Sequence, residues 1–208
     1  MRRASAAGVL TLALMVLAAC APAQDRRPQA GQQPTASRVD VHTPELRALK
    51  KAAGVEPCAP GAAAPAPDGL PDVTLPCLGG GRPVRLPTLR GPMVVNLFAQ
   101  WCGPCRTELP FYQRLHEEGK GVVSVLGVDY LDTQPEAALE LVRDSGVTFP
   151  LVADPDGELR DDLKIRGLPG VAFVDASGTL TGVEFRVVRS YGELRDLVEQ
   201  ELGVALPA

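Results

Sequence analysis

The segment MVVNLFAQWCGPC, residues 93–105, decides the fold class of this 208-residue chain. Residues 93–98 are β-branched, aromatic or aliphatic apart from one asparagine, a composition typical of a buried strand in a parallel or mixed sheet. Residues 106–118 have helical character, with apolar side chains on one face, and the helix is expected to stop at Gly119. The pattern therefore places two cysteines between the end of a buried strand and the first turn of a helix, in an α/β fold.

The two cysteines, Cys102 and Cys105, have a spacing that suits thiol–disulfide chemistry. The thiolate is the nucleophile in such reactions, and a free cysteine ionises near pH ~8.5. Unpaired N–H groups and the helix dipole favour an anion at a helix N-terminus, where a Cys-x-x-Cys thiol can have a pKa of ~3.5–7.5. Gly103 permits close approach, and Pro104 presets a helical φ angle. We expect Cys102 to attack a substrate disulfide and Cys105 to resolve the mixed disulfide.

The longer string NLFAQWCGPCRTELP, residues 96–110, resembles the TlpA/ResA branch of the thioredoxin superfamily. The resemblance implies a thioredoxin-like α/β fold with a central mixed sheet flanked by helices. Members of this branch are membrane-tethered, extracytoplasmic disulfide reductases, and several act in cytochrome c maturation. The implied partners are protein disulfides, including apocytochrome c, and a membrane thiol donor of the CcdA/DsbD type. The implied active centre needs no cofactor besides its cysteine pair.

Further site residues follow from the same resemblance. Glu108 stands three residues after Cys105, where ResA-like proteins carry a glutamate that tunes the thiols; a solvent-exposed residue of the first helical turn is the alternative. Pro169 precedes a strand, where the superfamily holds a cis-proline that faces the cysteine pair. Gly170 departs from the threonine that most relatives have next. The implied substrate contacts are Trp101, which we expect to act as a lid beside the nucleophile, Gly103, Pro104 and the Leu168 backbone.

The rest of the C-terminal part follows the β-α-β-α-β-β-α order of a thioredoxin domain. We expect strands at residues 122–128, 149–152, 171–174 and 181–185, and helices at 134–145, 158–164 and 191–202. Residues 73–75 and 84–86 predict an additional N-terminal hairpin around the glycines at 79–81.

The N-terminus has the pattern of an export signal. Two arginines precede an apolar stretch, residues 6–17, that is shorter than the ~20 residues a membrane-spanning helix needs. The string Leu17-Ala18-Ala19-Cys20 resembles the bacterial lipobox, whose cysteine carries diacylglycerol; the alternative is an ordinary signal peptide cleaved near Ala21 or Ala23. We expect a protein anchored by lipid at the extracytoplasmic face of the cell membrane.

A tether separates this signal from the folded part. Residues 21–37 are rich in Pro, Gln and Ala and show no apolar periodicity. Thr43 and Pro44 predict the start of a short helix that ends at Gly54. The expected organisation is a lipoprotein signal at 1–20, a tether with a short helix at 21–56, and a thioredoxin-like domain at 57–208.

Two further cysteines, Cys58 and Cys77, remain if Cys20 carries lipid. Four cysteines allow three pairings, and with Cys102 and Cys105 in one motif, Cys58–Cys77 is the natural remainder. Such a bridge would stabilise the fold by ~3 kcal/mol, and we expect it to be structural. A second redox pair, or a resolving thiol for Cys102, is the alternative. We expect no metal site, because a zinc ribbon needs two Cys-x-x-Cys knuckles and the chain has one.

Composition and spacing weigh against other function classes. The net charge is −4, with no basic run beyond the first residues, so we expect no nucleic-acid partner, and we expect a monomer. A copper chaperone of the Sco type has Cys-x-x-x-Cys and a distal histidine, and a peroxidase of the peroxiredoxin class has a single-cysteine Thr-x-x-Cys motif; both patterns are absent here. The direction of electron flow stays open between reductant and oxidant, and Gly103-Pro104 favours the reductant.

Overall fold

The computed structural model describes residues 39–207, which belong to one compact unit that begins at residue 36. The expected signal, Cys20 and the tether lie outside the described residues. The helix α1 (Pro44–Ala53) packs against α3 (Pro135–Asp144), and Leu46 is fully buried. The expected domain boundary at residue 57 therefore falls inside the compact unit, because α1 contributes to its core.

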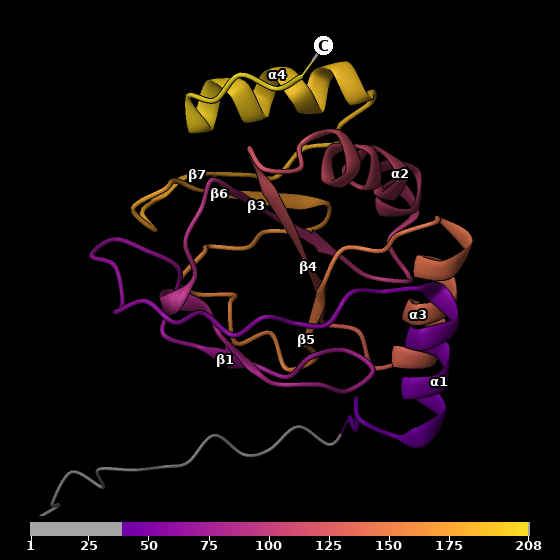
Figure 1. Cartoon of the computed structure of the whole chain (residues 1–208). Coiled ribbons are helices and arrows are strands. Elements are labelled where there is room, and N and C mark those ends of the chain that lie inside the picture. Colours follow the sequence, from indigo (N-terminus) through magenta and orange to yellow (C-terminus); the bar gives the residue numbers. More distant parts are fainter. Residues whose placement is uncertain (1–38, 208) are drawn as a thin grey trace, which may run out of the picture. The chain divides into compact units, whose positions relative to one another are not determined.

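A five-stranded mixed sheet forms the centre, in the order β5-β4-β3-β6-β7 (Figure 1). Its middle strand β3 (Met93–Phe98) pairs in parallel with β4 (Ser124–Tyr130) and antiparallel with β6 (Gly170–Val174). The outer strands are β5 (Leu151–Asp154), parallel to β4, and β7 (Leu180–Glu184), antiparallel to β6. This arrangement confirms the mixed sheet and the position of the 93–98 strand at its centre.

The four α-helices within residues 39–207 bury their apolar side chains in one core cluster on one face of the sheet. Besides α1 and α3 these are α2 (Gly103–Glu118) and α4 (Tyr191–Leu202), and Figure 1 shows α2 near α4, and α1 beside α3. The helix ends follow their capping residues: Thr43 Oγ1 accepts the Leu46 N–H of α1, and Gly54 ends that helix with a φ of 74°.

A second core cluster lies on the opposite face of the sheet. The expected hairpin covers this face: β1 (Thr74–Leu75) pairs antiparallel with β2 (Val84–Arg85), which continues into the short 3₁₀ turn η1 (Leu86–Thr88). The backbone of residues 76–78 then pairs with the outer edge of β5, through the Ala153 N–H to Pro76 and the Leu78 N–H to Leu151. Of the helices that the structure describes, none is long and apolar enough to cross a membrane.

The prediction of a helix at residues 158–164 is wrong. This segment forms successive turns, and the Asp154 carboxylate accepts the N–H groups of Glu158 and Leu159. Lys164 has a φ of 53°, which no right-handed helix accommodates. A segment this short cannot overcome helix nucleation by itself, so its packing decides its shape.

Candidate active site

Cys102 occupies the N-cap of α2, directly after the turn that leaves β3. Its Sγ accepts the backbone N–H of Cys105 at 3.3 Å, so the sulfur lies where the first helical turn offers unpaired donors. The two cysteines form a disulfide with their Cα atoms 5.3 Å apart. Cys102 is 5% exposed and Cys105 is 1% exposed, which makes Cys102 the sulfur that a partner reaches first. The nucleophilic role of Cys102 and the resolving role of Cys105 stay predictions.

The residues flanking Cys102 leave its approach open. Gly103 and Pro104 are exposed, and a Cβ on Gly103 would meet no atom within 4 Å. Trp101 is 54% exposed, and its Nε1–H donates to the Leu131 carbonyl at 3.2 Å. The indole is therefore a surface side chain held at one end, as a lid requires.

Asp132 also holds this loop, and its role was not predicted from the sequence. Its Oδ2 accepts the Gln100 N–H at 2.7 Å, two residues before Cys102, and its Oδ1 accepts the Gln134 N–H at 3.0 Å. Both Asp132 and Asp129 are almost fully buried. Burial, reinforced by the neighbouring Asp132 carboxylate, raises the pKa of Asp129 well above its usual value. A protonated Asp129 can then donate to Asp132.

A sequence signal for these two residues exists in hindsight. Asp129 is the last residue but one of β4, and Asp132 follows the strand; β4 runs parallel to β3, which leads into Cys102. Parallel neighbouring strands bring their carboxyl ends to one edge of the sheet. Acidic residues at the end of the second strand were therefore candidates for contact with the cysteine loop.

Glu108 is buried on α2, one turn after Cys105, and the alternative of a solvent-exposed residue is wrong. Its Oε1 accepts the Val188 N–H at 2.7 Å, and its Oε2 has no hydrogen-bond partner within residues 39–207. Burial raises the pKa of Glu108 to about 7; the nearby Glu193 also raises it, whereas the Val188 N–H opposes the shift. Glu108 can therefore gain or lose a proton near neutral pH.

The Leu168–Pro169 peptide bond is cis, as expected, and β6 begins at the next residue. Leu168 and Pro169 line a shallow pocket together with Phe185. Gly170, where the family pattern has threonine, faces the Phe185 ring: a Cβ there would lie 3.0 Å from it. The glycine is therefore explained by the aromatic ring that fills the space of a side chain.

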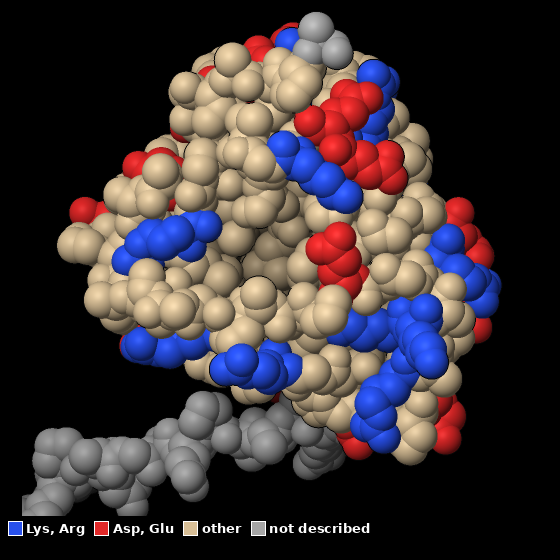
Figure 2. Space-filling view, in the orientation of Figure 1, with Lys and Arg blue, Asp and Glu red and all other residues tan. Residues whose placement is uncertain are grey.

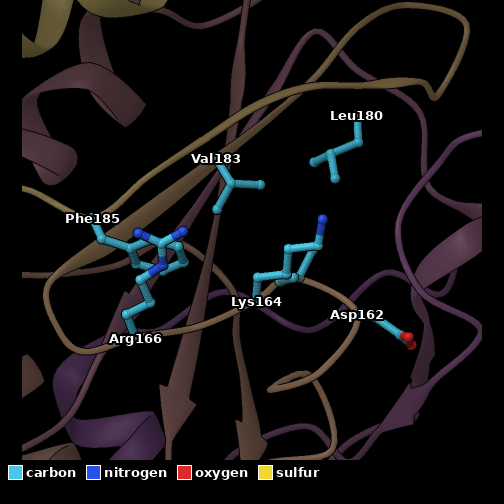
Figure 3. Close-up of a pocket in the computed structure, with 7 residues that line it drawn as sticks. Asp162, Lys164, Arg166, Leu180, Val183 and Phe185 are labelled. Atoms are coloured by element: carbon cyan, nitrogen blue, oxygen red, sulfur yellow. The ribbon is translucent and has the colours of Figure 1, made fainter.

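A second pocket adjoins this loop and shares Arg166 and Phe185 with the first. Figure 3 shows Lys164 and Arg166 directed toward the side formed by Leu180, Val183 and Phe185, while Asp162 is turned away. The two pockets combine an apolar wall with three cations, Lys164, Arg166 and Arg186. On the face drawn in Figure 2, acidic and basic side chains are interspersed around an uncharged central hollow.

Cys58 and Cys77 form the second disulfide, with their Cα atoms 6.0 Å apart. This confirms the expected pairing and separates both residues from Cys102. Both are buried, at 6% and 0% exposure. Their structural role stays a prediction.

In this chain the central strand β3 leads into a Cys-x-x-Cys helix, and the neighbouring strand β6 starts after a cis-proline. This combination defines the class of thioredoxin-fold proteins. Comparison with known proteins narrows this class. The sequence profile of the AhpC/TSA family matches residues 67–183, more than half of the chain, and the chain belongs to this family.

Curated relatives and solved structures agree with this assignment. The chain is 35% identical over 113 residues to the thiol:disulfide interchange protein DsbE of Pseudomonas fluorescens, and 30% identical over 123 residues to the thiol-disulfide oxidoreductase ResA of Oceanobacillus iheyensis. These matches cover 53% and 57% of this chain, but only 61% and 64% of the relatives. The structure of MTB DsbF superimposes with a TM-score of 0.56 at 29% identity, covering 63% of this chain and 98% of that one.

Proposed function

We propose that this protein is an extracytoplasmic thiol–disulfide oxidoreductase that reduces protein disulfides through Cys102 and Cys105. One observation carries the proposal: the more exposed sulfur of the pair caps a helix N-terminus and accepts the backbone N–H of Cys105. This position stabilises a thiolate and leaves it open to a partner. The names of the similar proteins support the same chemistry.

The reaction balances over two exchanges. In the reduced protein, the Cys102 thiolate attacks one sulfur of a substrate disulfide, forms a mixed disulfide and releases the other substrate sulfur as a thiolate. Cys105 then loses its proton and attacks Cys102, which releases the second substrate thiolate. The substrate gains two electrons, and the protein ends in the Cys102–Cys105 disulfide observed here. A dithiol donor must return it to the reduced form.

Glu108 supports this sequence from the same helix. Glu108 follows Cys105 by three residues on α2, and the pKa of its carboxyl group is about 7. When the carboxyl group is ionised, it can accept the proton that Cys105 must lose before it attacks. Glu108 is therefore a positioning and proton-handling residue for the resolving step.

Substrate binding uses the surface around the cysteine pair. The Leu168 backbone offers strand-like pairing, the exposed Trp101 ring precedes the nucleophile and can contact the substrate, and the pockets that share Arg166 and Phe185 receive flanking side chains. This combination favours an extended, partly unfolded polypeptide. Apocytochrome c, whose relevance comes from the TlpA/ResA resemblance, is the candidate substrate.

The N-terminal sequence supplies the proposed location. Acylation of Cys20 would hold the domain at the outer face of the cell membrane, where a thiol carrier of the CcdA/DsbD type would reduce it. Cys20→Ser should move the protein from the membrane fraction to the soluble fraction, whereas continued membrane association would contradict the anchor.

The redox equilibrium of Cys102–Cys105 with glutathione tests the direction. We expect a reducing couple, and a potential of about −120 mV, that of a strong oxidant, would contradict this expectation. Cys105→Ser should accumulate mixed disulfides with protein substrates, and Cys102→Ser should abolish reduction of insulin. Peroxide consumption that exceeds disulfide reduction would favour the peroxidase alternative instead.

A further inference from the structure

Lys50 of α1 is a buried cation that the proposed reaction does not use. Its side chain is 8% exposed, and its Nζ contacts the Cys77 Sγ at 2.8 Å and the Gly80 carbonyl at 3.0 Å. None of the ion pairs formed by residues 39–207 includes Lys50. A buried ammonium normally has a carboxylate or another anion beside it. Here its nearest partner is one sulfur of a neutral disulfide.

The backbone around the ammonium is fitted to this contact. Gly79 and Gly81 both have positive φ angles, 70° and 130°, and lie against Lys50 and Cys77. A Cβ on Gly79 would lie 2.8 Å from the Lys50 side chain, and a Cβ on Gly81 would lie 3.1 Å from the Cys77 sulfur. The turn between β1 and β2 thus has no side chains where it encloses the ammonium and the sulfur.

The other sulfur of the disulfide has a different neighbour. The Cys58 Sγ lies 3.0 Å from the Leu151 carbonyl oxygen, which accepts hydrogen bonds and repels an anion. A thiol at Cys58 could donate its S–H to this oxygen, whereas a thiolate at Cys77 would meet the Lys50 ammonium. The Cys58 sulfur therefore has a neighbour that suits a thiol, and the Cys77 sulfur has a neighbour that suits a thiolate.

We propose that Cys58–Cys77 is a second redox-active pair, in which Lys50 stabilises Cys77 as the thiolate that leaves when the disulfide is reduced. Cys58 is the sulfur that is attacked, since it is the more exposed of the two and lies between the exposed residues Pro57 and Ala59. A leaving thiol of low pKa departs faster, and Lys50 gives Cys77 this property.

The reductant is a dithiol, and the electrons balance. One thiolate of the dithiol attacks Cys58 and displaces the Cys77 thiolate; the second thiolate closes the reductant into its own disulfide and releases Cys58. Of the two protons of the dithiol, one is retained as the Cys58 thiol and one goes to solvent. The Lys50 ammonium and the Cys77 thiolate then form a buried ion pair.

Redox titration of the full chain in dithiothreitol buffers tests this proposal. Residues 52–85 and 91–106 are the tryptic peptides that carry the two pairs, so alkylation after acid quenching followed by mass analysis gives a separate equilibrium constant for each pair. Lys50→Met should lower the constant for reduction of Cys58–Cys77 by about 10–100-fold, the effect of losing a charged hydrogen bond. The equilibrium constant for reduction of Cys102–Cys105 should stay within about twofold of its wild-type value in the same variant.

Two variants control for the charge. Lys51→Met removes the exposed neighbouring lysine and should leave both constants unchanged, while Lys50→Arg should retain most of the wild-type value. A Lys50→Met constant within about twofold of wild type would overturn the proposal, as would a wild-type pair that is reduced only when the protein unfolds. If Lys50→Met does not fold, the proposal is tested by the thiolate absorbance of the reduced Cys102→Ser/Cys105→Ser protein. A Cys77 thiolate that persists well below pH ~8.5 supports the proposal, and the absence of this thiolate refutes it.

Discussion

Replacing Glu108 by glutamine should remove a pH-dependent loss of stability. In the folded protein, burial raises the pKa of this carboxyl group to about 7, from an ordinary value of 4.5. A group whose pKa is higher in the folded state binds its proton more tightly there. Its contribution to stability is fully present below pH 4.5, and it declines as the pH rises until the group is ionised above pH 7.

The size of the effect follows from the two pKa values. They differ by about 2.5, and a tenfold change in proton affinity corresponds to about 1.4 kcal/mol, so full ionisation of Glu108 lowers the free energy of unfolding by about 3 kcal/mol. Between pH 5 and pH 8 the loss should be about 2–3 kcal/mol. Glutamine keeps the shape and the acceptor for the Val188 N–H, but it cannot ionise.

Urea unfolding of wild type and Glu108→Gln at pH 5 and pH 8 measures this difference. The variant should lose about 2–3 kcal/mol less than wild type over this interval. Glu117→Gln, an exposed position on the same helix, is the control and should match wild type. Equal pH dependence in wild type and Glu108→Gln would refute the assignment of a raised pKa to Glu108.

Two further substitutions test the surroundings of the cysteine pair. Asp132→Asn should lower the free energy of unfolding by about 1–3 kcal/mol. The substitution removes the charge from the acceptor of the Gln100 N–H and from the partner of Asp129. Unchanged urea unfolding would contradict this prediction. Gly170→Ala should destabilise the protein by about 1–3 kcal/mol, because its Cβ would lie 3.0 Å from the Phe185 ring, and Gly170→Ala/Phe185→Leu should recover part of the loss in thermal unfolding.

Elements with strong local signals could be predicted from the sequence. The 93–98 strand and the 191–202 helix have the expected bounds, because a β-branched apolar run and a serine cap determine them locally. The cysteine pairings and the cis-proline also agree with expectation.

Residues whose role depends on distant packing were not predictable in this way. Asp129 and Lys50 are ordinary charged residues in the sequence, and only the assembled sheet and the packing of α1 bury them. Glu108 was identified by resemblance, but its burial required Val188, which lies 80 residues further along the chain. Sequence periodicity indicates which face of a helix or strand is apolar, but it does not indicate which residues of other elements pack against that face.

The pairing of residues 76–78 with β5 has a consequence for the behaviour of the protein at high concentration. An open outer strand is a template on which a second molecule can add its own strand, and this is how sheets grow into aggregates. Here a segment of the same chain occupies that template, and the neighbouring Cys58–Cys77 bond fastens it. Molecules at high concentration would therefore meet one another without an unpaired β5 edge on this side.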